Sequence, residues 1–234
     1  MGYSGGYEAT SLRTWELFRQ IAVVKNDAPG FMRRLGVVLL AAGSSFRMQR
    51  PKLLLAWGGT SIAGHQIRIW NEFGVGQIAV VCAEGDRAMQ SELDRIHCPP
   101  ENRILNPAAH NGMFSSIRCA ARWSGWKAGL THWAITLGDQ PHLRRETLQS
   151  LLMFAATHPD KICQPRLKDH FRHPVLMPKT VFVELGTTKA TMLKEFLETM
   201  PGNVLGCEVD DPGLDQDIDT PADYEKALAR FSIR

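Results

Sequence analysis

The stretch Val37-Val38-Leu39-Leu40-Ala41-Ala42-Gly43-Ser44-Ser45 decides the fold of this chain. Its first four residues form a short, uninterrupted apolar run, which is typical of a strand covered on both faces. The five residues that follow are too small and too flexible to make a core element. We therefore predict a buried strand that leads directly into a loop at Ala41.

The same alternation continues along the chain. Apolar runs predict further strands at 78–82, 103–105 and 133–137, and helices are predicted at 61–73, 86–94, 112–122 and 144–157. Strands that alternate with helices at this spacing indicate an α/β protein. We predict a three-layer α/β/α, Rossmann-like fold, in which a mostly parallel sheet carries helices on both faces.

After residue 160 the pattern is less regular. Strands are predicted at 161–164, 173–176 and 204–209, and a helix near 190–199. A closing helix is predicted to start at Pro221, with Thr220 as its N-cap, because Ser and Thr are favoured at that position and Pro at the next one.

The two ends of the chain differ in character. Residues 8–24 have the spacing of a helix, and the Pro-Gly dipeptide within residues 27–30 predicts a turn that ends it. We expect residues 1–34 to be an N-terminal appendage, helical or disordered, and residues 35–234 to form a single domain.

Composition excludes several classes of protein. The chain has 234 residues, of which 44% are hydrophobic and 22% charged, and its formal net charge is +3. No apolar run approaches the 18 or so residues of a membrane span, and no aromatic-basic nucleic-acid motif is present. Five dispersed cysteines favour free thiols in a reducing compartment. We expect a cytoplasmic protein that binds neither nucleic acid nor membranes.

The Gly/Ser-rich loop after the first strand can bind phosphate. Small residues let backbone N–H groups approach phosphate oxygens, and Arg47 and Lys52 add positive charge nearby. The alternative is a flexible surface loop with solvated cations. A Walker loop is excluded because Lys52 is flanked by Pro51 and Leu53, and a dinucleotide fingerprint because Gly43 is the only glycine of the loop.

Acidic residues form a second candidate site. Asp139 follows the predicted strand at 133–137, where a carboxylate is well placed to hold Mg²⁺. Asp217 and Asp219 are two residues apart, so on an extended segment they point the same way. The alternatives are a turn aspartate that bonds its own backbone and a solvated loop before a helix. Because open parallel sheets bind ligands beyond the carboxyl ends of their strands, Asp139 and the phosphate loop are expected to share one crevice.

Several motifs, taken together and in order, resemble those of one known family. They are Leu-Ala-Ala-Gly-x-Ser-x-Arg-Met at 40–48 with Lys52, Asn106-Pro107, Gly112-Met113-x-Ser115-Ser116, Leu-Gly-Asp-Gln-Pro at 137–141, His173-Pro174-Val175-Leu176, and Asp-Ile-Asp-Thr-Pro-x-Asp at 217–223. The chain resembles the molybdenum cofactor cytidylyltransferase-like, or MobA-like, branch of the nucleotidyltransferases over residues 35–230. The resemblance implies the fold of the nucleotide-diphospho-sugar transferases.

The resemblance also implies roles for individual residues. Nucleotide contacts are implied for Leu40, Ala41, Ala42, Gly43, Ser44, Ser45, Asn106, Gly112 and Ser116. Contacts to the reacting phosphates are implied for Arg47 and Lys52. Asp139 and Asp219 are implied as Mg²⁺ ligands with Asp217 as a helper, and His173 is implied to lie on the acceptor side.

The reaction implied by the resemblance is transfer of a nucleoside monophosphate from a triphosphate to a phosphorylated acceptor. CTP is favoured because the Ala-Ala-Gly start accompanies cytidylyltransferases, and molybdopterin is the favoured acceptor, with a molybdenum hydroxylase as a further partner. Three positions depart from the family pattern, namely Gln49, Arg172 and the stretch 186–191. A sugar phosphate or other metabolite as acceptor, and a non-catalytic cofactor chaperone, therefore stay open.

Overall fold

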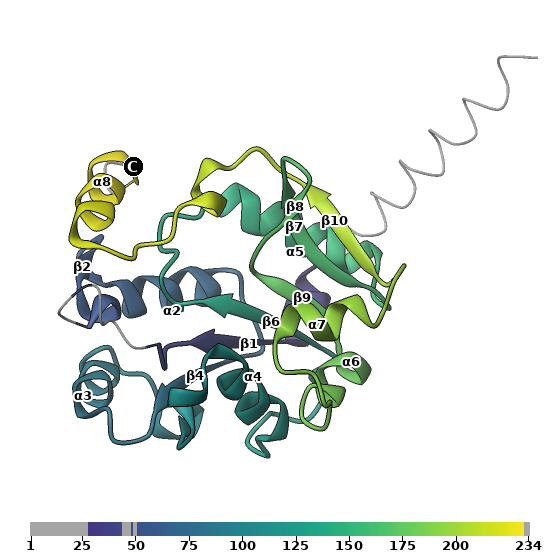
Figure 1. The fold of residues 1–234 in the computed structure, drawn as a ribbon, viewed down its shortest axis with the longest axis horizontal. Helices are drawn as coiled ribbons and strands as arrows, with labels where there is room; N and C mark the ends of the chain where they lie inside the picture. The colour runs from purple at the N-terminus through teal and green to yellow at the C-terminus, as the bar shows by residue number, and fades with distance from the viewer. Residues whose placement is uncertain (1–27, 44–47, 49–50, 232–234) are drawn as a thin grey trace, which may run out of the picture.

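A computed structural model of the chain describes residues 28–43, 48 and 51–231. Its centre is an eight-stranded sheet in the order β10-β7-β9-β6-β1-β4-β5, with β8 paired to β7 (Figure 1). The strands are β1 (Leu35–Leu40), β4 (Gln77–Ala83), β5 (Arg103–Asn106), β6 (His132–Leu137), β7 (Ile162–Leu167), β8 (His170–Phe171), β9 (Val175–Pro178) and β10 (Val204–Glu208). A separate two-stranded hairpin consists of β2 (Ala56–Trp57) and β3 (Thr60–Ser61).

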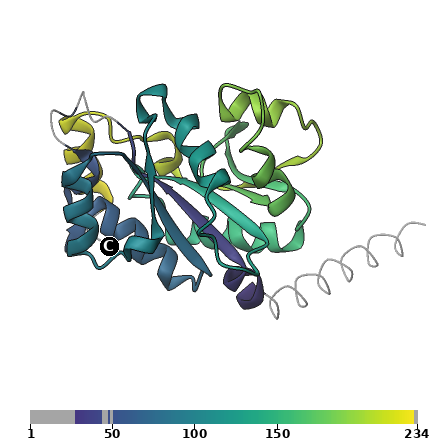
Figure 2. The same cartoon turned by 90° about the horizontal axis from the view of Figure 1, so that it is seen from below.

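The helices connect these strands and cover the sheet (Figure 2). They are α2 (Ile62–Glu72), α3 (Arg87–Arg95), α4 (Met113–Arg122), α5 (Arg145–Thr157), α6 (Lys179–Glu184), α7 (Leu193–Glu198) and α8 (Pro221–Phe231). Short 3-10 turns are η2 (Lys52–Leu54), η3 (Pro100–Asn102), η4 (Ala109–Asn111) and η5 (Pro212–Asp215). None of the helices in the described part of the chain is long and apolar enough to cross a membrane.

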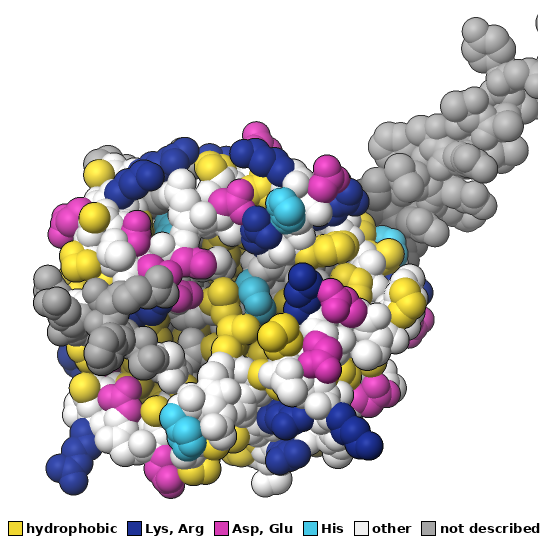
Figure 3. All heavy atoms as spheres, in the orientation of Figure 1, with side chains coloured by type: hydrophobic (Ala, Val, Ile, Leu, Met, Phe, Trp, Pro, Cys, Tyr) yellow, Lys and Arg dark blue, Asp and Glu magenta, His cyan; other side chains and the backbone are white. Residues whose placement is uncertain are grey.

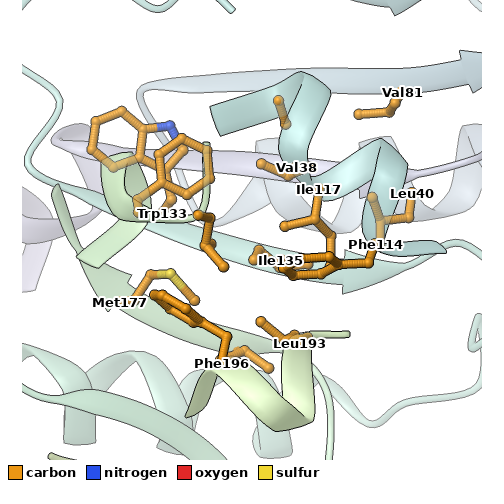
Figure 4. Close-up of a cluster of buried hydrophobic side chains, with 14 of the residues drawn as sticks. Val38, Leu40, Val81, Phe114, Ile117, Trp133, Ile135, Met177, Leu193 and Phe196 are labelled. Atoms are coloured by element: carbon orange, nitrogen blue, oxygen red, sulfur yellow. The ribbon is translucent and has the colours of Figure 1, made fainter. Parts of the chain in front are cut away.

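The apolar run at residues 37–40 lies in β1, the central strand of the sheet. All six residues of β1 are buried, and β1 pairs in parallel with both β4 and β6. Side chains alternate between faces along a strand. Accordingly, Val38 packs with Phe114 and Ile117 of α4 on one face (Figure 4), whereas Val37 packs with the core on the opposite face. The prediction of an α/β fold with a mostly parallel sheet and helices on both faces is confirmed.

Two strands of the sheet, β8 and β9, run antiparallel to the strands they pair with. β9 is antiparallel to both β6 and β7. The chain leaves β7 through a two-residue turn, Lys168-Asp169, in which both residues have positive φ, and returns at once as β8. Since parallel strands need a crossover of a dozen or more residues, the short return from β7 to β9 leaves only the antiparallel pairing.

Near the N-terminus the structure contradicts the predicted turn. Residues 28–33 are helical, where the Pro-Gly dipeptide predicts a turn, so that prediction is wrong. Phe31, only 4% exposed, packs in the same core cluster as Leu35 and Trp70, and this tertiary packing outweighs the local turn preference. The predicted helix at 8–24 lies outside the described residues, and the division at residue 34 stays a prediction.

The closing helix begins as predicted. Thr220 precedes α8, and its hydroxyl accepts a hydrogen bond from the backbone N–H of Asp223 at 3.2 Å. In return, the Asp223 carboxylate accepts from the Thr220 backbone N–H at 2.9 Å and from its hydroxyl at 2.7 Å. This reciprocal arrangement satisfies donors that the first turn of a helix leaves without partners.

The segment of residues 210–219, called here the acidic segment, crosses from β10 toward the carboxyl end of β6. It is anchored at its start by Asp211, which is 1% exposed. The Asp211 carboxylate accepts hydrogen bonds from the backbone N–H groups of Gly213 and Arg144, both at 2.9 Å, and from the Thr147 hydroxyl at 2.7 Å. Asp211 therefore ties the acidic segment to the start of α5.

We predict that Asp211→Ala lowers the free energy of unfolding by about 2–4 kcal/mol, because three buried donors lose their acceptor together. Urea denaturation measures this loss. Asp210→Ala is the matched control, since the Asp210 side chain is exposed, and it is expected to cost less than about 0.5 kcal/mol. Equal losses in the two variants would contradict the anchoring role of Asp211.

Candidate active site

A cavity of about 1330 Å³ opens where β1, β4, β5 and β6 end. The space-filling view shows the molecule hollowed on this side (Figure 3). The side chains and backbone that line it come from five segments: Leu40, Ala42, Gly43, Met48, Pro51, Lys52, Leu53; Ala83, Glu84, Gly85, Asp86; Ala109, His110, Gly112, Met113, Ser116; Leu137, Gly138, Asp139; and Asp219. The expectation that the phosphate loop and Asp139 share one crevice is thus confirmed for the described part of that loop.

Lys52 joins two acidic residues at one end of this cavity. Its ammonium group donates to Asp139 Oδ2 at 2.6 Å and to Asp219 Oδ1 at 3.3 Å. It also donates to the backbone carbonyl oxygen of Ile218 at 3.1 Å. Asp139 follows β6 and Asp219 ends the acidic segment, so Lys52 connects three stretches that are far apart in sequence.

These contacts determine the charge of Lys52. Burial on its own lowers the pKa of the ammonium group, but the charges and hydrogen bonds of Asp139 and Asp219 outweigh burial. The pKa of Lys52 is therefore raised from its ordinary value, and the side chain stays protonated at neutral pH. Together, the side chains of Lys52, Asp139 and Asp219 carry a net formal charge of −1.

The donor set at this end fits a magnesium ion. Mg²⁺ is usually held by one or two carboxylates, with water and substrate phosphates completing its octahedron. Asp139 and Asp219 supply two carboxylates, both lining the cavity. Among the described residues no cluster of three or more His, Cys, Asp or Glu side chains could hold a metal by itself, so the remaining ligands would come from substrate and water.

Asp217 has a different partner from Asp219. One of its carboxylate oxygens accepts a hydrogen bond from Gln140 Nε2 at 2.8 Å, and Asp217 is not among the residues that line the cavity. The buried side chain of Ile218 separates the two aspartates. The role of Asp217 as a helper to the metal stays a prediction.

The end of β1 is held on both sides before the loop begins. The backbone N–H of Ala41 donates to the Val81 carbonyl at 2.9 Å, and the N–H of Gly138 donates to the Leu40 carbonyl at 3.1 Å. A side chain at Gly138 would meet that Leu40 oxygen at 2.8 Å, so the close approach requires glycine. Ala42 and Gly43 consequently face the cavity, whereas the Ala41 side chain is buried.

Three predicted site residues, Ser44, Ser45 and Arg47, lie outside the described residues. Of the same sequence motif, Leu40, Ala42, Gly43 and Met48 line the cavity. The nucleotide contacts predicted for Leu40, Ala41, Ala42 and Gly43 stay predictions.

Asn106 is a buried residue that holds the loop between β5 and α4 in place through side-chain hydrogen bonds. It is 1% exposed, and its amide nitrogen donates to the hydroxyl oxygens of Ser115 and Ser116 at 2.8 and 2.9 Å. Its amide oxygen accepts from the backbone N–H of Ala108 at 2.9 Å. Gly112, with φ of 87°, then caps the start of α4 and lines the cavity together with Ser116. Asn106 thus shapes the pocket through its neighbours.

His173 lies beside the acidic end of the site. Its Nδ1 atom is 3.4 Å from the carbonyl oxygen of Ile135. Burial lowers the pKa of the imidazole, while that hydrogen bond and the charges of Asp139 and Asp217 act in the opposite direction without cancelling the shift. His173 does not line the cavity, and its place on the acceptor side stays a prediction.

Sequence reasoning missed the segment 83–86 and the residues Ala109, His110 and Met113, all of which line the cavity. Residues 83–86 lie at and after the end of β4, and the other three lie between β5 and the start of α4. The apolar pattern predicts the positions of both strands. The rule that placed Asp139 in the crevice applies equally to the carboxyl ends of these strands. That rule was therefore the available signal.

Solved structures with the same α/β fold include nucleotidyltransferases. The MobA-like NTP transferase domain family matches residues 37–204. The chain belongs to this family, whose nucleotidyltransferases typically depend on a divalent metal.

Individual relatives are distant but cover almost the whole domain. The chain is 25% identical over 207 residues to the molybdenum cofactor cytidylyltransferase of Escherichia coli, covering 86% of this chain and 99% of the relative. It is 27% identical over 207 residues to the purine catabolism protein PucB of Bacillus subtilis, covering 83% and 96%. Identities at this level leave the substrates open, and the family assignment rests on the match over residues 37–204.

Two solved structures are similar to this chain at comparable identity and coverage. The Rv0371c homologue from Mycobacterium sp. strain JC1 has a TM-score of 0.68 and 25% identity, and covers 84% of this chain and 96% of its own. Rv0371c of Mycobacterium tuberculosis in complex with manganese has a TM-score of 0.63 and 24% identity, and covers 83% and 97%. The second of these structures is described as holding a divalent metal.

We predict that Asn106→Ala lowers the free energy of unfolding by about 2 kcal/mol, since the Ala108 N–H and two serine hydroxyls lose a buried partner. The backbone amides of residues 108–112 are expected to exchange with solvent faster, as hydrogen-exchange mass spectrometry measures. Asn111→Ala in the same loop, where the side chain is exposed, is the control. If the exchange rates of these amides are the same in Asn106→Ala as in wild type, the loop does not depend on the hydrogen bonds of Asn106.

Proposed function

We propose that this chain transfers a cytidylyl group from CTP to the terminal phosphate of molybdopterin, or of its molybdenum-bearing form, and releases pyrophosphate. The observation that carries the proposal is the contact of Lys52 with both Asp139 and Asp219 inside the cavity that Ala42 and Gly43 also line. One cavity thus combines a cation for phosphates, carboxylates for a metal and a small-residue loop for a nucleotide.

The size of the cavity supports a reaction between two substrates. Pockets for one small ligand usually occupy about 300–1,000 Å³. This cavity, at about 1330 Å³, exceeds that range. A triphosphate and a phosphorylated acceptor can therefore be held side by side, which a transfer reaction requires.

The chemistry needs positioning more than it needs a base. An oxygen of the acceptor phosphate attacks the α-phosphorus of CTP, the bond from that phosphorus to the bridging oxygen breaks, and pyrophosphate leaves with the bond's electron pair. An acceptor phosphate is already ionised near neutral pH, so no proton has to be removed. The barrier is then lowered by alignment and by charges that face the phosphates.

Lys52 and the carboxylates of Asp139 and Asp219 have different roles in placing charge near the phosphates. The protonated ammonium of Lys52 stabilises negative charge that builds on the phosphates, and its bonds to Asp139 and Asp219 fix its position. Asp139 and Asp219 would hold Mg²⁺, which supplies charge neutralisation when bound. Arg47 is proposed to assist at the triphosphate.

CTP is proposed as donor because the Ala41-Ala42-Gly43 start resembles that of cytidylyltransferases, and because a relative of the chain is the cytidylyltransferase of E. coli. The same relative supports a molybdopterin acceptor. A sugar phosphate or another phosphorylated metabolite is the rival acceptor, since Arg172 and the stretch 186–191 depart from the family pattern on the acceptor side.

We predict that Asp139→Asn and Lys52→Ala each lower the rate of pyrophosphate release at least about 100-fold, the scale seen when one charge-stabilising group is lost. The assay offers each of the four triphosphates with Mg²⁺ and molybdopterin, and CTP is expected to be the best donor. Asp160→Asn and Lys194→Ala, exposed residues that do not line the cavity, are the matched controls.

Two results would contradict the proposal. Near-normal turnover in both site variants would remove Lys52 and Asp139 from the mechanism. Absence of turnover with any triphosphate, together with tight binding of molybdopterin, would instead make the protein a non-catalytic cofactor binder.

A further inference from the structure

The segments that line the cavity follow four neighbouring strands, and they lie in the same order as those strands in the sheet. Along the sheet the order is β6, β1, β4 and β5. Asp139 follows β6, Ala42 follows β1, Glu84 follows β4 and Ala109 follows β5. Three spacings of about 4.8 Å separate the first of these strands from the last, so the cavity extends roughly 14 Å from its Asp139 end to its Ala109 end.

This order fixes which end of the cavity faces the base, given the proposed function on which this inference rests. The triphosphate belongs beside Lys52, because Lys52 is the one described Lys or Arg that lines the cavity. A nucleotide extended from that end across β1 then brings its base above β4 and β5. The base therefore lies against the segments that contain Glu84 and Ala109.

Glu84 is held in place at this end while its carboxylate stays available. Its backbone N–H donates to the Asn106 carbonyl at 3.0 Å, which joins the ends of β4 and β5. Its exposed side chain forms no hydrogen bond or ion pair with any other described residue. The nearby Asp86 differs, because its Oδ1 atom already accepts from the Met89 N–H at 3.0 Å as the N-cap of α3.

We propose that Glu84 selects the base, by accepting a hydrogen bond from the exocyclic amino group of cytosine. An ionised carboxylate can only accept hydrogen bonds, and the 4-amino group of cytosine donates them. Uracil has a carbonyl oxygen at the same position. This oxygen can only accept hydrogen bonds, so it would be repelled by the negatively charged Glu84 carboxylate, which also only accepts them. Glu84 thus rejects UTP, which matches CTP in nearly every other respect.

The test compares donors in wild type and Glu84→Gln. Wild type is expected to prefer CTP to UTP in kcat/KM by at least about 10-fold, the lower range for one specific contact to a base. A glutamine amide can turn its nitrogen toward the uracil oxygen, so the CTP-to-UTP ratio in Glu84→Gln is expected to fall at least about five-fold. Most of that change is expected in KM, since Glu84 is far from the reacting phosphorus.

Further variants separate base selection from other effects. Glu84→Ala is expected to weaken CTP without improving UTP, because it removes the acceptor and supplies no donor. Glu101→Gln, an exposed glutamate that does not line the cavity, is the control and is expected to keep the wild-type ratio. Thermal denaturation of all three variants checks that the fold is retained.

Equilibrium binding of CTP and UTP with Mg²⁺, measured by calorimetry without acceptor, distinguishes failure of this inference from failure of the proposed function. If the CTP-to-UTP ratio is unchanged in Glu84→Gln and this variant turns over CTP as fast as wild type, the role of Glu84 is overturned. The proposed transferase function is then unaffected. Absence of both nucleotide binding and turnover in wild type overturns the proposed function, and this inference with it.

Discussion

The ion pairs of Lys52 with Asp139 and Asp219 are the contacts on which the rest of the site depends. Two carboxylates brought to one place repel each other unless a cation lies between them. Lys52 supplies that cation from the turn after the Gly/Ser-rich loop, while one carboxylate follows β6 and the other ends the acidic segment. The three segments meet only because β1 and β6 are neighbours in the sheet. The fold and the charge of the site therefore depend on one another.

The acidic segment shows how similar residues acquire different tasks. The segment contains five aspartates, and the sequence pattern predicts a metal role only for Asp217 and Asp219, which are two residues apart. In the structure Asp211 is buried and holds the start of α5, Asp215 forms an ion pair with Arg172 at 2.5 Å, and Asp217 accepts from Gln140. Only Asp219 reaches Lys52. Contacts with other parts of the chain, which no local pattern contains, separate the anchors from the candidate ligand.

Features of the fold that depend on local sequence could be predicted, and features that depend on long-range contacts could not. The buried strands and the glycine loop have strong local signals, and their positions followed from apolar runs and strand-end turns. The antiparallel β9, the short helix α6 and the helical residues 28–33 did not follow, because pairing and tertiary packing decide them. The Asp139 end of the cavity was predicted from motifs, whereas the loop at Glu84 carries no motif, and the structure shows that it lines the cavity.

The most direct test of the central claim is a crystal structure of the protein with CTP and Mn²⁺, in which anomalous scattering locates the metal. The account predicts one metal peak within about 2.3 Å of carboxylate oxygens of both Asp139 and Asp219, since oxygen–metal bonds to such ions are near 2.0–2.2 Å. It also predicts the triphosphate beside Lys52 and the base above β4 and β5. A metal bound away from both carboxylates, or a nucleotide outside the cavity, would contradict it.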